Sequence, residues 1–395
     1  MVTKPTRRPC TVRARSGPRA LCLLLVASWL AGIPLASATP PTNQPPARVG
    51  ITYAHDDVTE VPWSIHILKV DRSRADLRFE TTLGGGNQLG MGLVSDQLKS
   101  LPADAGRVLA AINGDFYNNA SKYPGDPKGI QICRGELVSS PDEGRSCFWV
   151  DASGAPRIAT VQSKFSVTLP DGRSVPVELN RERTSGTVVL YTSAQGASTQ
   201  TGASLELILK RGADTPWLPL QAGKTYTAQV QEIRKEGNSP LTRDTMALSV
   251  SSKVAGQFAA VKVGDTIRVS TATAPEVAGS TTAIGGGPAL VHGQKIMSFP
   301  GFLQPRAPRT ALGWNKDYFF LVVVDGRQRI SAGMTFSELA TYMLNLGCDE
   351  ALNLDGGGSA TMWYLGNVMN SPSEGRERPA ANALLVVKKD QPSQK

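Results

Sequence analysis

The fold of this 395-residue chain is decided by residues 319–358, FFLVVVDGRQRISAGMTFSELATYMLNLGCDEALNLDGGG, which have the pattern of a strand, a helix and a strand. The apolar run Phe319–Val324 predicts a strand buried on both faces. Thr335 and Glu338 form a capping-box pattern, and the apolar residues that follow at helical spacing predict an amphipathic helix. Ala351–Leu354 predicts the second strand. A unit of this kind predicts a crossover between two parallel strands.

Carboxylates stand where the predicted strands end. Asp325 follows the first strand and Asp355 the second, so parallel strands would place both at one sheet edge, where ligands commonly bind. Another buried strand, Val108–Ile112, leads to Asp115, which would reach the same edge if that strand joined the sheet in the same direction. Gly356–Gly358 follow Asp355 and let backbone amides approach a ligand. Taken alone, each of these motifs is also compatible with an ordinary tight turn.

The middle of the chain, about residues 157–273, contains short Thr-, Val- and Ser-rich runs separated by turn residues. This texture predicts strands, either as an elaboration of the main sheet or as a second small domain. We therefore expect an α+β fold with a mixed β-sheet core, a βαβ crossover near the C-terminus and a strand-rich middle region. The expected parts are a signal peptide (1–38), a Pro-rich linker (39–50), a strand-rich segment (51–104), a main domain (105–390) and a tail (391–395).

The net charge of +9 is concentrated at the N-terminus. Six basic and no acidic residues lie within residues 1–38, which leaves only +3 on the rest and argues against a nucleic-acid partner. An apolar run to Leu35 and the small residues Ala36 and Ala38 follow, which predicts a cleaved signal peptide and a periplasmic or secreted protein. An uncleaved anchor and twin-arginine export are the alternatives. No later stretch is long and apolar enough for a membrane span, and the oligomeric state is left open.

Cleavage after Ala38 would leave three cysteines, Cys133, Cys147 and Cys348. In an oxidising compartment Cys133 and Cys147 would close a short loop, so we expect a disulfide between them. Three reduced thiols are the alternative.

Other motifs are glycine-rich or basic. Gly285–Gly287 predicts a backbone-lined wall or bulge, or else a hairpin connection. Arg309 and the charged run Glu374–Pro379, which precedes a final strand at Ala383–Val387, offer guanidinium groups that can fork onto a phosphate. His292 is a candidate acid or base. The signatures of zinc proteases, α/β-hydrolases and nucleotide-binding loops are absent from the sequence.

Taken together and in order, these motifs resemble the phosphodiester glycosidase family. The matching stretches are AINGDFY (within 110–117), NRERTSGTVVLYT (180–192), GGGPALV (285–291), RTALGW (309–314), LVVVDGR (321–327), LNLDGGGSATM (352–362) and ERPAANALLV (377–386). The resemblance implies an exported hydrolase that cleaves a sugar-1-phosphodiester, such as an N-acetylglucosamine-1-phosphodiester, at the anomeric C–O bond. The products would be a free sugar and a phosphomonoester.

The resemblance also implies roles for individual residues. Asp115 and Asp355 would serve, in either order, as base or nucleophile and as stabiliser of the oxocarbenium ion, with Arg309 and Glu377 completing the catalytic set. The substrate-binding residues implied are Asn113, Gly285, Gly286, Gly287, Asp325, Gly356, Gly357, Gly358, Ser359, Arg378 and Asn382.

Two other functions fit the same residues. Asp115, Asp325 and Asp355 could bind Mg²⁺ or Ca²⁺ in a metal-dependent phosphodiesterase that cleaves the P–O bond, although the glycosidase interpretation requires no cofactor. The chain could also be a secreted protein that binds a glycan without turnover. Both glycosidase configurations, retaining and inverting, are compatible with the sequence.

Overall fold

The computed structural model describes residues 50–119, 122–212, 216–300 and 305–389, all within one compact unit. The predicted signal peptide, almost all of the linker and the tail lie outside these residues. Within the described residues, no helix combines the length and the apolar character needed to cross a membrane.

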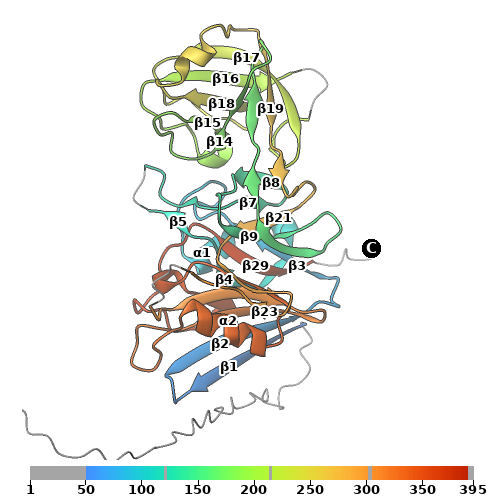
Figure 1. The fold of residues 1–395 in the computed structure, drawn as a ribbon, viewed down its shortest axis with the longest axis vertical. Helices are drawn as coiled ribbons and strands as arrows, with labels where there is room; N and C mark the ends of the chain where they lie inside the picture. Colours follow the sequence, from blue (N-terminus) through green and yellow to red (C-terminus); the bar gives the residue numbers. More distant parts are fainter. Residues whose placement is uncertain (1–49, 120–121, 213–215, 301–304, 390–395) are drawn as a thin grey trace, which may run out of the picture. The chain divides into compact units, whose positions relative to one another are not determined.

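A seven-stranded sheet contains both strands of residues 319–358. Its order is β1 (Ile51–Val58), β2 (Trp63–Asp71), β25 (Tyr318–Val324), β24 (Arg309–Trp314), β26 (Glu350–Asn353), β22 (Ala289–His292) and β23 (Lys295–Ile296). Strand β2, from the N-terminal part of the described residues, thus pairs with β25, from the C-terminal part. Figure 1 shows β1 and β2 in blue and the helix α2, which follows β25, in orange.

Helix α2 (Phe336–Asn345) connects β25 to β26. The predicted capping box is confirmed: the Glu338 amide donates to the Thr335 hydroxyl, and the Glu338 carboxylate accepts from the Thr335 amide. The apolar face of the helix packs on this sheet. β25 and β26 both pair antiparallel with β24, which lies between them. They therefore run in the same direction without pairing with each other, and the expected crossover is split by an intervening strand.

A five-stranded sheet packs against the first and shares its core. Its order is β28 (Asn367–Val368), β27 (Met362–Tyr364), β4 (Arg107–Asn113), β29 (Ala383–Lys388) and β3 (Leu77–Thr81). The strand before Asp115 is β4, which belongs to this five-stranded sheet. It does not join the sheet of β25 and β26, which was the condition for Asp115 to reach their edge.

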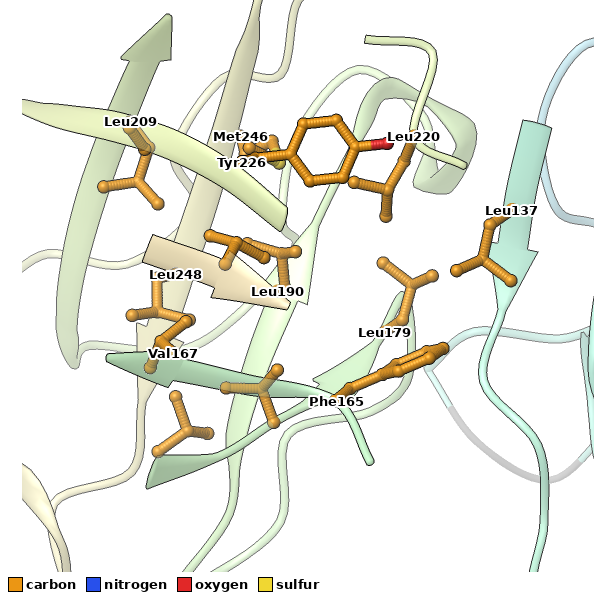
Figure 2. Packing of buried hydrophobic residues seen from close by; sticks show 14 of the residues in the cluster. Leu137, Phe165, Val167, Leu179, Leu190, Leu209, Leu220, Tyr226, Met246 and Leu248 are labelled. Atoms are coloured by element: carbon orange, nitrogen blue, oxygen red, sulfur yellow. The ribbon is translucent and has the colours of Figure 1, made fainter. Parts of the chain in front are cut away.

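The middle of the chain forms two further sheets and a core of its own. One has the order β10 (Pro156–Thr160), β9 (Ser146–Val150), β21 (Thr282–Gly285), β7 (Gln131–Cys133) and β8 (Glu136–Ser139). The other has eight strands: β13 (Ser174–Pro176), β12 (Ser166–Thr168), β19 (Thr266–Ser270), β17 (Thr225–Arg234), β16 (Leu205–Arg211), β18 (Thr245–Val250), β15 (Val188–Tyr191) and β14 (Glu178–Leu179). Figure 2 shows Phe165, Leu190, Tyr226 and Leu248 among the apolar side chains of this core.

The remaining elements are short. They are the pairs β5 (Tyr117–Asn118) with β6 (Asp126–Pro127) and β11 (Gln162–Ser163) with β20 (Thr273–Ala274), helix α1 (Val94–Gln97), and 3₁₀ turns at Leu98–Ser100, Ala103–Ala105, Ser193–Gln195, Ala255–Phe258 and Gly357–Ser359. Strands predominate, within the broad α+β class that was expected.

The expected disulfide is wrong in this structure, where Cys133, Cys147 and Cys348 are buried free thiols. Cys133 on β7 pairs with Thr282 of β21, whereas Cys147 on β9 pairs with Gly285 on the other side of β21. Two strand spacings of about 4.8 Å already separate the two cysteines. That exceeds the Cα separation of about 7 Å that a disulfide can bridge.

Candidate active site

Asp115 is held by backbone and side-chain groups from several segments. It lies just beyond β4 and is only 1% exposed. Its amide donates to Asn382 Oδ1 at 2.7 Å, and its Oδ2 accepts from the Gly129 amide at 2.6 Å. Gly285 packs directly on this carboxylate, since a Cβ there would overlap Oδ2 and lie 2.7 Å from the Gly129 Cα. The buried carboxylate therefore depends on glycine at both contacting positions.

The environment of Asp115 favours its neutral form. Burial raises the pKa of this carboxyl to about 7, and the positive charge of Arg145 and the amide hydrogen bonds oppose the rise only in part. The negative charge of Asp355 adds to it. A carboxyl with such a pKa exchanges its proton near neutral pH, as a general acid or base must.

Asp355 lies beside Asp115 because the ends of two strands from different sheets are joined there. The Asp355 amide donates to the Gly114 carbonyl at 2.9 Å, and Asn113 Nδ2 donates to the Asp355 carbonyl at 2.6 Å. Burial raises the pKa of the Asp355 carboxyl, while the Ser359 hydroxyl and the charge of Arg378 lower it. The structure thus brings the two predicted carboxylates together, although their strands do not share a sheet.

Arg378 supplies positive charge at the glycine loop after Asp355. Its Nη2 donates to Ser359 Oγ at 2.8 Å, and its Nη1 lies 3.3 Å from Glu374 Oε1. A Cβ at Gly358 would lie 2.7 Å from Arg378 Nη1, so the missing side chain is what lets the guanidinium rest on the loop. A forked cation beside a glycine-rich backbone is suited to a phosphate.

The two predicted asparagines are fully buried and bonded to the protein itself. Asn113 Oδ1 accepts from the Thr310 hydroxyl at 2.7 Å and from the Thr361 amide at 3.1 Å. Asn382 Nδ2 donates to Gln131 Oε1 at 2.9 Å. Both side chains therefore position the segments that carry Asp115 and Asp355.

Gly285–Gly287 lies between strands of two different sheets, β21 and β22, and is not a hairpin connection. The Gly287 amide donates to the Asn353 carbonyl at 2.7 Å, and Asn353 Nδ2 donates to the Gly287 carbonyl at 2.9 Å. These bonds fasten the triplet to β26, next to Asp355. His292 is exposed and pairs with Glu350 at 3.0 Å.

The Arg309 side chain makes hydrogen bonds and a ring contact with other parts of the protein. Its Nε donates to the Met334 carbonyl at 2.8 Å and its Nη2 to the Pro305 carbonyl at 2.9 Å, and the guanidinium lies 4.1 Å from the centre of the Phe336 ring. Burial lowers the pKa of Arg309 to about 10. These contacts tie β24 to the start of α2.

Asp325 and Glu377 also bond to other parts of the protein. The Asp325 carboxylate accepts from the Ser371 amide at 3.0 Å and from Asn370 Nδ2 at 3.2 Å, and lies 3.1 Å from His66 Nε2. Glu377 Oε2 accepts from the Ser95 amide in α1 at 3.1 Å. None of these bonds involves Asp115 or Asp355.

The three aspartates considered as metal ligands do not gather around one point. In the described residues, no three or more His, Cys, Asp or Glu side chains form a group that could hold a metal ion.

Two charged residues near Asp115 were not predicted. Arg145, just before β9, has Nη2 at 3.9 Å from Asp115 Oδ1 and lies 4.5 Å over the Phe116 ring. Asp126 on β6 is 8% exposed, and burial raises the pKa of its carboxyl to about 7, opposed by Arg181. Their sequence settings, PDEGR and PGDPKG, resemble ordinary charged turns, and only the three-dimensional neighbours distinguish them.

Comparison with known proteins relates part of the chain to a family. Residues 221–387 match the phosphodiester glycosidase family. This segment belongs to that family, as the ordered motifs predicted. It contains Gly285, Asp355 and Arg378, whereas Asp115 and Arg145 precede it.

Similar proteins agree with this assignment. The bovine N-acetylglucosamine-1-phosphodiester alpha-N-acetylglucosaminidase is 38% identical over 82 residues, which is 20% of this chain and only 15% of that protein's length. A hypothetical protein from Synechocystis superposes with a TM-score of 0.69 at 18% identity, over 85% of this chain and 62% of that one. A Burkholderia pseudomallei protein described as exported gives a TM-score of 0.62 at 23% identity, over 83% and 75%. The two structures show that the fold is shared.

Proposed function

We propose that this protein is an exported phosphodiester glycosidase that hydrolyses a sugar-1-phosphodiester at the anomeric C–O bond. An N-acetylglucosamine-1-phosphodiester is the model substrate, because the bovine relative bears that name. The observation that carries the proposal is the pairing of Asp115 and Asp355 at the joined ends of β4 and β26, with Arg378 on the adjoining glycine loop.

The chemistry of such a substrate matches these groups. A phosphomonoester is a good leaving group once its charge is neutralised, so little acid assistance is needed. Arg378 and the amides of Gly356–Gly358 would hold the phosphate. Asp115 and Asp355 would provide the carboxylates that act at the anomeric carbon and stabilise the oxocarbenium-like transition state.

The first test is the position of bond cleavage. The purified protein is incubated with a panel of glycosyl-1-phosphodiesters in ¹⁸O-water, with and without EDTA. We expect the label in the released sugar and unchanged turnover in EDTA. Label in the phosphomonoester, or loss of turnover in EDTA, would favour a metal-dependent phosphodiesterase and overturn the proposal.

The second test removes one carboxylate. Asp355→Asn should lower kcat by roughly 10³-fold with unchanged folding, since it removes a charge that acts on the transition state. Asp151→Asn, at a half-buried site in a turn, is the matched control. Near wild-type turnover by Asp355→Asn would show that the scheme is wrong.

Export is part of the proposal and rests on the basic and apolar N-terminal pattern that ends at Ala38. Expression with the native N-terminus in a bacterial host tests it, with N-terminal sequencing of the periplasmic or medium fraction. We expect the mature chain to begin at Thr39. Retention of the full-length chain in the cytoplasm would contradict export.

A further inference from the structure

Arg145 lies outside the segment that matches the family, yet its side chain reaches the predicted catalytic carboxylate. Its guanidinium rests on the Phe116 ring, 4.5 Å from the ring centre, next to Asp115 in sequence. Gly287 lies close by, since a Cβ added to it would be in van der Waals contact with the Arg145 Cα at 3.9 Å. The guanidinium is therefore held against the Asp115 loop, near the glycine triplet.

Three atoms in this pair are buried without a hydrogen-bond partner: Arg145 Nε, Arg145 Nη2 and Asp115 Oδ1. The other Asp115 oxygen is bonded to the Gly129 amide, so Oδ1 is the one directed toward the arginine. Leaving such groups unpaired destabilises the folded protein, and more so when they are charged. Unsatisfied buried groups of this kind call for an explanation, and a catalytic role or a bound water supplies one.

The distance between Arg145 Nη2 and Asp115 Oδ1 indicates what kind of atom could bind between them. At 3.9 Å, Arg145 Nη2 and Asp115 Oδ1 are too far apart for a direct hydrogen bond. A single oxygen at about 2.8 Å from each would bond to both. When Asp115 is ionised, as a base must be, that oxygen has to accept from the arginine and donate to the carboxylate, which a hydroxyl or water can do and an ionised phosphate oxygen cannot.

We propose that Arg145 and Asp115 together hold the attacking water of the glycosidase reaction, so that the enzyme inverts the anomeric configuration. This inference rests on the proposed function. Asp115 takes one proton as the water oxygen bonds to the anomeric carbon. The bond from that carbon to the phosphate oxygen breaks, its electron pair leaves with the phosphomonoester, and the proton passes from Asp115 to solvent.

This role distinguishes Arg145 from Arg378. Arg378 bonds to the Ser359 hydroxyl on the glycine loop and would act on the phosphate, whereas Arg145 faces the carboxylate. The charges that act on Asp115 are those of Arg145 and Asp355, and Asp115 in turn acts on the buried Asp126. Removing Arg145 should therefore affect catalysis and the ionisation of Asp115 together.

The test combines product stereochemistry with variant kinetics. ¹H NMR of the wild-type reaction should show the inverted sugar anomer before mutarotation. Arg145→Gln should lower kcat by about 10²–10³-fold, the effect of losing one positioned donor, with KM nearly unchanged. The acid limb of its kcat profile should move to higher pH, because the charge that lowers the Asp115 pKa is gone. Arg145→Lys should keep the acid limb near its wild-type position.

Two controls separate the possible failures. Arg157→Gln changes an exposed arginine that pairs with Asp151 and should leave every parameter unchanged. Arg378→Gln should raise KM. A retained anomer, or an Arg145→Gln variant that raises only KM, overturns the inference while the proposed function stands. A wild-type enzyme that is inactive on the whole panel overturns the proposed function and this inference with it.

Discussion

Replacing Asp115 by asparagine should stabilise the protein, and by more at pH 8 than at pH 5. In the folded chain the Asp115 carboxyl has a pKa of about 7 because it is buried, against an ordinary value of 3.8. Between these values the unfolded chain has lost a proton that the folded chain keeps. The free energy of unfolding of the wild type therefore falls as the pH rises through this window, by about 1.4 kcal/mol per pH unit.

The size of the change in unfolding free energy depends on how much of the pH range between the two Asp115 pKa values is covered. From pH 5 to about pH 7 the wild type loses on the order of 3 kcal/mol through this carboxyl, and above pH 7 the loss is complete. The amide side chain of the variant does not titrate, so the variant avoids this loss. The difference in unfolding free energy, variant minus wild type, should thus rise by about 3 kcal/mol between pH 5 and pH 8.

Urea unfolding followed by tryptophan fluorescence at pH 5, 6, 7 and 8 measures this difference. Asp151→Asn is the control: hydrogen bonds from Ser153 and Arg157 lower the pKa of the half-buried Asp151. Asp151 is therefore ionised in both states throughout the range, and its replacement should give a pH-independent difference. A change below about 1 kcal/mol for Asp115→Asn would refute the reasoning, because Arg145 would then outweigh burial.

Three further substitutions test the construction of the site. Gly285→Ala places a methyl against the Asp115 carboxylate and should cost about 1–3 kcal/mol by overpacking, whereas Gly256→Ala, with open space around it, should be neutral; equal thermal stability of the two would contradict the packing argument. Arg309→Ala should lower the unfolding free energy by roughly 1–3 kcal/mol, because the Pro305 carbonyl loses its donor and the Met334 carbonyl keeps only the Ala307 amide. KM for the phosphodiester should be unchanged, and a raised KM without destabilisation would indicate that Arg309 contacts the phosphate. Asn113→Ala should cost about 1–3 kcal/mol in urea unfolding because the Thr310 hydroxyl and the Asp355 carbonyl lose a partner, and an unchanged midpoint would argue against its positioning role.

The features that the sequence predicted well are local ones. The capping box at Thr335 and Glu338 and the buried strands before Asp115 and Asp355 were predicted because their causes lie within a few residues. The proximity of the two aspartates was expected from a shared sheet edge. In the structure it arises from hydrogen bonds between the ends of two sheets, a pairing that strand periodicity does not encode.

Contacts between residues far apart in the chain could not be predicted from the sequence. Arg145 stands in a loop with the composition of a solvated turn, and only its distance to Asp115 reveals it. Cys133 and Cys147 are close in sequence, but β21 arrives from residue 282 and separates them. Arg309 was expected at the phosphate, yet its Nε and Nη2 donate to the carbonyls of Met334 and Pro305, both outside its own strand.

The position of Asp115 ahead of the family-matched segment explains why the whole described chain is needed to build the site. Residues 221–387 provide Asp355, Arg378 and Gly285, but the carboxyl with the near-neutral pKa and its arginine come from earlier strands. Those strands are held in place by the later ones: β4 pairs with β29, and β9 pairs with β21. Gly285, at the end of β21, then touches the Asp115 carboxylate itself. Burial raises the Asp115 pKa, and Gly285 is part of what buries it, so the packing of the earlier and later segments and the ionisation of Asp115 are linked through this contact.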